Sequence, residues 1–270
     1  MSKPPSMPTK LLAVAINLIF GQVPTILFLI WVERNCMLPW NKWGLDFPLI
    51  DLQSDSVPVK LLWNAGLIMM FGVLHTTFAH PFINKHIRKV LPGRYTRTLF
   101  MVVTGFSVSL IMSCWQNTGI ELYSLPLSKR KLDVISVTVF TLLYSGNVIP
   151  FIKFGILGVF GLEQIFQKEH DPEKRSEGTQ KLVTNGVYGI VRHPMYTVSM
   201  GAYGIAPRMT LDRAWIVLFC LVYLYTLGIP MEERKLVKEF GQPYVEYQKK
   251  VPAVIPKIPF FQRNKRVKSH

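Results

Sequence analysis

The chain has few acidic residues, few cysteines and few charged residues of any kind for its length. Charged residues make up 17% of the 270 positions, whereas a soluble domain carries about 25%. The three cysteines (Cys36, Cys114 and Cys220) form no CxxC pair and have no histidine at metal-ligand spacing. They therefore predict neither a disulfide framework nor a zinc site. The sequence has no internal repeat and no low-complexity region. These absences argue against an ordinary soluble domain, a disulfide-rich secreted domain and a repeat protein.

What the chain has instead is long apolar runs. Hydrophobic residues make up 49% of it, and its mean hydropathy is +0.25. A membrane-spanning helix needs about 20 mostly apolar residues. We therefore predict an all-α fold, a polytopic membrane helical bundle of about six transmembrane helices ending in a C-terminal helical hairpin. The expected spans are residues 11–32, 61–79, 97–115, 132–154, 194–207 with an extension toward the amino terminus, and 211–231. The fifth is short and contains polar residues.

The distribution of basic residues sets the expected topology. Lys and Arg number 2 before the first span, 5 in residues 80–97, 6 in residues 153–192 and 10 after Met231, which places 23 on one side. The opposite loops hold only 8. The positive-inside rule then predicts both termini in the cytosol and an even number of spans. Basic residues between apolar spans also suit anionic lipid headgroups better than nucleic acid. Membrane lipids are thus the expected partners, and no nucleic acid is.

The chain divides into three expected regions. Residues 1–160 hold the N-terminal transmembrane helices, which pack the bundle and give access to a substrate. Residues 161–258 form a C-terminal region with the helical hairpin, and residues 259–270 form a basic, disordered tail. No small-residue cleavage signal follows the first apolar run, so that run is predicted to be a retained span rather than a signal peptide.

Two polar motifs bracket the last hairpin. Arg192 and His193, followed by Tyr196, precede it, and Glu232 and Glu233 follow it. A hairpin that crosses a bilayer and returns brings its two ends to the same surface, so these groups are predicted to meet there. Arg192 offers a planar fork for a carboxylate, and His193 can exchange a proton near neutral pH. This set could hold a charged cofactor in a cytosolic pocket.

Simpler interpretations of the same residues remain open. Arg192 and His193 could merely lie at the membrane interface with their charged ends in water, and the glutamates could be solvated beside Arg234 and Lys235. Adjacent helical positions diverge by about 100°, so only one glutamate is expected to face the bundle interior.

Further candidates lie near this expected pocket. Gly186 and Tyr188 stand in a turn before Arg192, and Tyr244 and Tyr247 share one face of a cytosolic helix because they are three residues apart. His75, near the cytosolic end of the second span, is either functional or a hydrogen-bonding partner between helices.

These motifs resemble a known family. Residues 182–196 read LVTNGVYGIVRHPMY and residues 232–256 read EERKLVKEFGQPYVEYQKKVPAVIP. Together they are similar to the carboxyl-terminal signature of the isoprenylcysteine carboxyl methyltransferase superfamily, which also holds phospholipid methyltransferases, methanethiol S-methyltransferases and the nurim proteins. Residues 71–115, with LHTTFAHP, are more similar to methanethiol S-methyltransferases and nurim than to isoprenylcysteine enzymes. In one departure, Val198 stands where many members have glycine.

The resemblance implies an integral membrane enzyme that uses S-adenosylmethionine to methylate a small thiol. A prenylcysteine carboxylate or a phospholipid headgroup remains possible as the acceptor. It implies the endoplasmic reticulum or nuclear envelope as the location, and His193 and Glu232 as catalytic residues. No metal is expected. The implied cofactor-binding residues are Arg192, His193, Tyr196, Glu232 and Glu233, with Gly186, Tyr188, Tyr244 and Tyr247 as secondary candidates.

Two other classes of function compete with this one. A non-enzymatic, nurim-like membrane protein would carry a degraded cofactor motif, whereas this chain keeps the glutamate pair and the tyrosine. A transporter would carry charged or broken helices at the bilayer midplane, whereas the polar clusters here lie at span ends. The oligomeric state stays open.

Overall fold

The computed structural model describes residues 5–34, 36, 48–146, 157, 160–166 and 182–257. The expected charged loop around residues 167–180 and the expected basic tail at 259–270 lie outside this set. The described elements are α1 (Met7–Ile16), η1 (Asn17–Gln22), α2 (Val23–Glu33), α3 (Val57–Ala79), α4 (Pro81–Ile87), η3 (Gly93–Tyr95), α5 (Thr96–Cys114), β1 (Glu121–Ser124), α6 (Lys129–Ser145), α9 (Leu162–Phe166), η4 (Gly186–Gly189), α11 (Pro194–Gly204), β2 (Arg208–Thr210), α12 (Leu211–Tyr223), η5 (Leu224–Gly228), α13 (Ile229–Phe240) and α14 (Gln242–Lys250).

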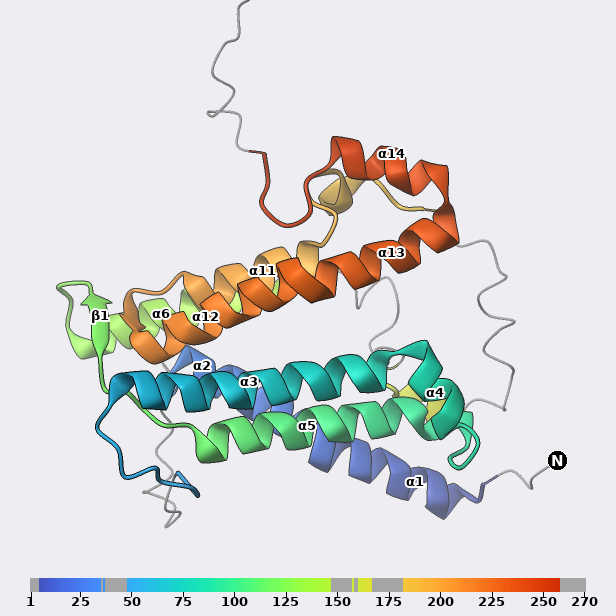
Figure 1. The fold of residues 1–270 in the computed structure, drawn as a ribbon, viewed down its shortest axis with the longest axis horizontal. Helices are drawn as coiled ribbons and strands as arrows, with labels where there is room; N and C mark the ends of the chain where they lie inside the picture. The colour runs from blue at the N-terminus through green and yellow to red at the C-terminus, as the bar shows by residue number, and fades with distance from the viewer. Residues whose placement is uncertain are drawn as a thin grey trace, which may run out of the picture.

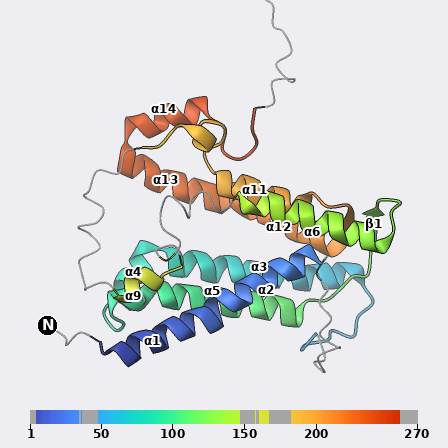
Figure 2. The same cartoon turned by 180° about the vertical axis from the view of Figure 1, so that it is seen from behind.

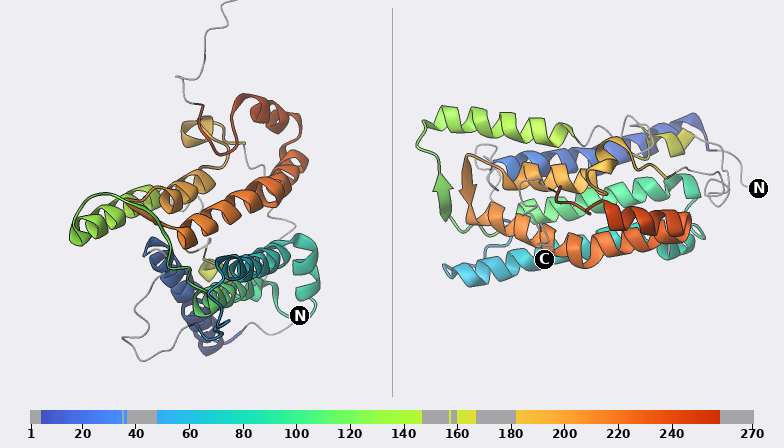
Figure 3. Two further views of the ribbon diagram at one scale, coloured as in Figure 1. Left: turned by 60° about the vertical axis from the view of Figure 1, so that its left-hand side comes forward. Right: turned by 90° about the horizontal axis from the view of Figure 1, so that it is seen from above.

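The helices form two groups that lie side by side (Figures 1 and 2). One group holds α1, α2, α3 and α5, with α4 across its end. The other holds α6, α11 and the continuous helix α12–η5–α13, and α14 lies outside the end of α13 (Figure 3). Contacts of α12 with α3 and of α2 with α6 join the groups. The predicted helical membrane bundle is thereby confirmed.

Among the residues that the structure describes, four helices are long and apolar enough to cross a membrane: Met7–Glu33, Val57–Ala79, Gly93–Cys114 and Leu211–Phe240. The expected count of six is not confirmed. The fourth expected span begins on α6, which ends at Ser145, and residues 147–156 lie outside the described set. The fifth falls on α11, whose 11 residues span only about 16 Å at 1.5 Å per residue, roughly half of the hydrocarbon core.

A small sheet also departs from the all-α expectation. β1 pairs antiparallel with β2, with Glu121 opposite Thr210 and Ser124 opposite Arg208. The sheet ties the segment before α6 to the start of α12 at one end of the bundle. We call this the far end, and the end that carries α4 and α13 the site end.

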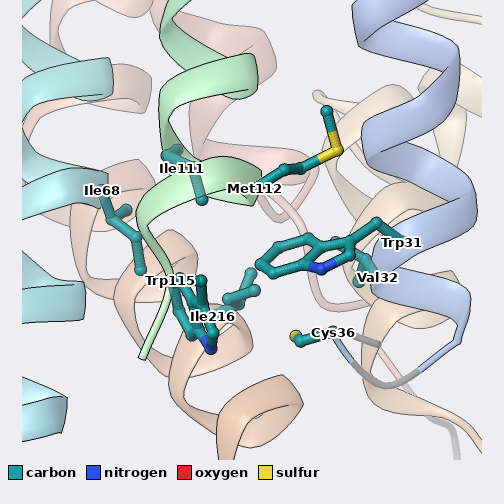
Figure 4. Packing of buried hydrophobic residues seen from close by; sticks show 8 residues of the cluster. All are labelled: Trp31, Val32, Cys36, Ile68, Ile111, Met112, Trp115 and Ile216. Carbon is teal, nitrogen blue, oxygen red and sulfur yellow. The ribbon is translucent and has the colours of Figure 1, made fainter. Parts of the chain in front are cut away.

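The main apolar core lies toward the far end (Figure 4). Trp31 and Trp115 meet edge-on with ring centroids 5.2 Å apart, and Ile111 and Ile216 pack in the same cluster. In the membrane region, Gly105 of α5 approaches the carbonyl of Phe20 so closely that a Cβ would overlap it. Such close backbone contact is how small residues hold membrane helices together.

Two helices contain π-helical turns directly before a proline. The segments η1 and η5 lead into α2 and α13, in which Pro24 and Pro230 occupy the first turn. Proline lacks an N–H, and its ring clashes with the preceding turn of an α-helix. The wider π-turn accommodates it, and the helix continues instead of breaking. Because η5 lies just before Glu232 and Glu233, it fixes the direction in which these side chains leave the helix.

Candidate functional site

The site is built where four separate segments meet at the site end of the bundle. The start of α11 lies against the chain that follows α14. The Arg192 N–H donates to the Pro252 carbonyl at 2.9 Å, and the His193 N–H donates to the Ala253 carbonyl at 2.9 Å. The Thr197 hydroxyl donates to the Val254 carbonyl at 2.6 Å. We call residues 251–254 the strap.

Arg192 is held by the protein on all three of its nitrogens. Nε donates to Glu233 Oε1 at 2.7 Å, and Nη2 lies 2.6 Å from the same oxygen. Nη1 donates to the carbonyl of Gln248 at 3.0 Å and to that of Val251. The amide of Gln248 then donates to Glu233 Oε2 at 2.8 Å. The Arg192 and Glu233 side chains are only 11% and 13% exposed, so this group forms a closed clamp on the strap.

His193 bridges the two glutamates. Its Nε2 lies 3.0 Å from Glu233 Oε1, and its Nδ1 lies 3.5 Å from Glu232 Oε2. Glu232 and Glu233 are adjacent on the helix, so their side chains diverge by about 100°. One imidazole can contact both because its two nitrogens lie on different edges of the ring. The Glu233 side chain is 13% exposed and that of Glu232 is 44% exposed, which agrees with the expectation of one inward-facing glutamate, yet both contact the same ring.

Glu232 forms the open arm of the site. Its side chain is 44% exposed, and one oxygen accepts a hydrogen bond from the Tyr196 hydroxyl at 2.9 Å. The Tyr196 ring stacks on His193 with centroids 5.4 Å apart. Tyr196 and His193 thus orient a carboxylate that can still reach a ligand.

The charges around His193 change its proton affinity. Burial by itself would lower the pKa of His193, but the hydrogen bonds and negative charges of Glu232 and Glu233 together outweigh burial and raise the pKa above its usual value. The carboxylate pair around this buried imidazole therefore favours its protonated form.

The secondary candidates line the outer side of this cluster. Tyr247 donates to the carbonyl of Tyr188 at 2.6 Å, and Tyr244 meets Tyr247 edge-on at 5.7 Å. Tyr244 and Tyr247 are 2% and 6% exposed, so they pack α14 against the site; burial raises the pKa of Tyr247 to about 12. Gly186 has a φ of +60° and open space where a side chain would stand.

Gln248 is a site residue that sequence reasoning missed. It lies four residues after Tyr244 on α14, so the two side chains lie on the same side of the helix. That spacing could have identified it.

The departure at Val198 also has a structural counterpart. A Cβ on Gly146, at the end of α6, would come within 2.9 Å of Val198 Cγ1. A glycine on α11 would let α6 approach closely. Here Gly146, on the α6 side of the contact, permits that approach instead.

His75 lies apart from these residues. Its ring sits between those of Phe71 and Phe100, at 5.3 and 4.9 Å, and Nδ1 is 3.5 Å from the Thr104 hydroxyl. This is the arrangement of a histidine that packs between helices.

Comparison with known proteins agrees with the motifs. Residues 135–243 match the family model described as phospholipid methyltransferase. A methanethiol S-methyltransferase from Pseudomonas deceptionensis is 29% identical over 203 residues, 75% of each chain. One from Crocosphaera subtropica is 25% identical over 76% of this chain and 78% of its own. A protein-S-isoprenylcysteine O-methyltransferase from Schizosaccharomyces pombe is 42% identical over 81 residues, 29% of this chain and 34% of its own.

No solved structure matches the chain. The family model covers α11, α12 and α13, including Arg192, His193, Tyr196 and both glutamates. The resemblance inferred from the two motifs is confirmed: residues 135–243 match the phospholipid methyltransferase family, and the relatives include methanethiol and isoprenylcysteine methyltransferases.

Proposed function

We propose that this protein is an S-adenosylmethionine-dependent membrane methyltransferase that methylates a small thiol. The observation that carries the proposal is the exposed Glu232 carboxylate, oriented by Tyr196 and His193 beside a clamp that already neutralises Arg192 with Glu233. The named methanethiol S-methyltransferases, aligned over three quarters of the chain, support the thiol as acceptor.

The residues present fit one part of the cofactor well. S-adenosylmethionine carries an ammonium group and ribose hydroxyls, and an exposed carboxylate such as Glu232 can accept hydrogen bonds from either. Arg192, the expected partner of the cofactor carboxylate, already has a protein oxygen next to each of its guanidinium nitrogens. We therefore assign ligand binding to Glu232, Tyr196 and His193, and assign Arg192 and Glu233 to holding them in place.

The chemistry asks little of the protein beyond alignment and proton removal. The cofactor supplies an electrophilic methyl group, and a thiol attacks well only as its thiolate. His193 Nδ1 and Glu232 Oε2 lie 3.5 Å apart at the open arm, so either can accept the thiol proton. Glu233 at His193 Nε2 keeps the ring in a fixed orientation, so that Nδ1 faces Glu232 and can accept the proton when the ring is neutral. Apolar helices around the site admit a lipid-soluble thiol and exclude water.

The membrane setting follows from charge. The basic excess on the side of residues 80–97 and of the carboxyl-terminal segment supports a cytosolic position for both termini and for the site. We propose a multi-pass protein of the endoplasmic reticulum or nuclear envelope.

The test is methyl transfer by detergent-purified protein with labelled S-adenosylmethionine and three acceptors: methanethiol, a farnesylcysteine analogue and phosphatidylethanolamine. Glu232→Gln should weaken cofactor binding more than tenfold by calorimetry, because the amide lacks the charge that attracts an ammonium group. Glu246→Gln is the matched control, since Glu246 lies exposed on α14 and pairs with Lys249. Equal affinities for the two variants would refute the assignment.

A second acceptor has its own support. The relative from Schizosaccharomyces pombe is a protein-S-isoprenylcysteine O-methyltransferase, and its aligned segment is 42% identical. A prenylcysteine carboxylate needs no base, so the two acceptors can be told apart. His193→Gln should slow methylation of a thiol more than that of a carboxylate.

A further inference from the structure

The connection between α3 and α5 contains α4, which packs one side against the bundle and exposes the other side at the site end. On α4, Ile83 and Ile87 are half-buried, and the Asn84 amide donates to the Phe78 carbonyl at 3.3 Å. These inward residues fix the helix across the end of the bundle (Figure 1). Phe82, Lys85 and His86 follow the i, i+3, i+4 spacing of one helical face of α4. Lys89 lies in the turn directly after the helix, and all four residues are exposed. We call these four residues the α4 outer face.

The charged residues of the segment that contains this face are all basic. Residues 80–97 contain five Lys and Arg and no Asp or Glu. Phe82 is 61% exposed and Val90, just beyond the helix, is 92% exposed. The Phe82 ring lies 4.4 Å from the ring of His86, so an aromatic group stands directly among the cations. An exposed aromatic beside lysines is the composition of a segment that lies at a membrane interface.

The position of this face relative to a bilayer is fixed by its neighbours. α4 directly follows Ala79, the last residue of one candidate span, and the next begins at Gly93. The outer face is therefore held within one short turn of the membrane surface. It lies at the same end as the site, because α12–α13 runs parallel to α3: Trp215 donates to the Leu61 carbonyl, and Tyr223 contacts Thr76 farther along both helices.

We propose that the α4 outer face binds the headgroups of anionic phospholipids, with Lys85 and Lys89 on the phosphate and carboxylate groups and Phe82 between the lipids. Two observations support this inference: the charged residues of the α4 outer face are basic, and the neighbouring spans hold the face at the bilayer surface. Basic residues at that position attract anionic headgroups. The proposal is independent of the methyl-transfer activity, because none of these residues belongs to the candidate site.

The test is lipid retention by the full chain in nanodiscs of phosphatidylcholine with or without phosphatidylserine. The protein should be enriched in bound phosphatidylserine by native mass spectrometry, and added salt should reduce the enrichment. The double variant Lys85→Gln/Lys89→Gln should lower the apparent affinity for phosphatidylserine about 25-fold, at about one fivefold step for each basic residue near the surface. Phe82→Ala should give a smaller decrease with the salt dependence kept.

A matched control exists at the far end. Lys129 and Lys131 are also exposed, at the start of α6, but Asp133 lies close to them in sequence. The variant Lys129→Gln/Lys131→Gln removes the same charge and should leave phosphatidylserine retention within twofold of the parent. Equal losses in the two double variants, or no preference for phosphatidylserine in the parent, would overturn the proposal. Binding of an acidic peptide at the α4 outer face without lipid enrichment would overturn it as well.

Discussion

Two clusters that combine an arginine with a carboxylate lie at opposite ends of the bundle. They differ in whether a carboxylate oxygen stays exposed to solvent. At the far end, Arg213 is fully buried. Its Nε donates to the Tyr203 carbonyl at 2.7 Å, its Nη2 to that of Ala202 at 2.9 Å and its Nη1 to that of Glu33 at 3.2 Å. These carbonyls belong to the last turns of α11 and α2, where helices leave acceptors unpaired. Arg213 therefore ties two helix ends to α12.

The neighbouring carboxylate is equally closed. Asp212 is 1% exposed. It accepts hydrogen bonds from the Trp115 indole at 2.9 Å and the Thr118 hydroxyl at 2.6 Å. At the site end, by contrast, the Arg192–Glu233 clamp is closed but Glu232 beside it is open. The comparison teaches that an arginine next to a carboxylate does not by itself identify a binding site. A better indication is a carboxylate that is held in a fixed orientation and can still accept a hydrogen bond from a ligand.

The largest predicted effect comes from breaking the far-end cluster. Arg213→Met should destabilise the protein by about 3–5 kcal/mol, because it leaves buried carbonyls without a donor. Thermal unfolding in detergent measures this loss. Arg208→Met is the control, since Arg208 forms a half-exposed pair with Glu121 at 2.6 Å and should cost about 1 kcal/mol or less. Similar losses in both variants would contradict the assigned role of Arg213.

The next effect comes from opening the clamp. Arg192→Met should lower stability by about 2–3 kcal/mol and weaken cofactor binding as well, because the strap and Glu233 lose their shared partner. Arg234→Met is the control: Arg234 is exposed, and within the described part of the chain it donates to the Pro230 carbonyl of its own helix. Limited proteolysis at the carboxyl terminus reports release of the strap. If Arg192→Met lost cofactor binding with stability and proteolysis unchanged, Arg192 would be a direct ligand instead.

A smaller loss of stability is predicted when Gln248 is replaced than when Arg192 is replaced. Gln248→Met should cost about 1–2 kcal/mol, because Glu233 Oε2 loses its donor in a buried setting. Gln242→Met is the matched control, since Gln242 donates to Glu246 at 2.9 Å on the exposed side of the same helix. Gln248→Lys restores a donor to Glu233 and should recover part of the loss. Equal stabilities of the two methionine variants would show that Gln248 holds nothing in place.

The sequence predicted the contacts at the site end better than those at the far end. Apolar runs identified the four long spans, although six were expected, and the return of one hairpin correctly predicted that Arg192 and Glu233 meet. The same reasoning gave no role to Asp212 and Arg213, because their partners are backbone carbonyls and side chains from helices far away in sequence. Such partners follow no spacing rule.

The remaining differences have physical causes as well. α11 is too short to cross a bilayer, and the sequence could not show that Ile205 leaves the helix toward β2. The sequence also did not show that protein acceptors occupy Arg192. These acceptors are the carbonyls of Gln248 on α14 and Val251 in the strap, and their positions depend on tertiary contacts.

The smallest predicted effect is a pH dependence that only the site end should show. The pKa of His193 is raised in the folded protein above the value of about 6.5 expected when unfolded. The protonated ring therefore stabilises the fold fully below about pH 6.5, and this contribution is lost as the pH rises through the raised pKa. Thermal unfolding between pH 5.5 and 8.5 should show this decline in the parent and a flatter profile in His193→Gln. A cationic ligand on Glu232 should oppose protonation of the ring and move the decline to lower pH, whereas Arg213→Met should leave its position unchanged.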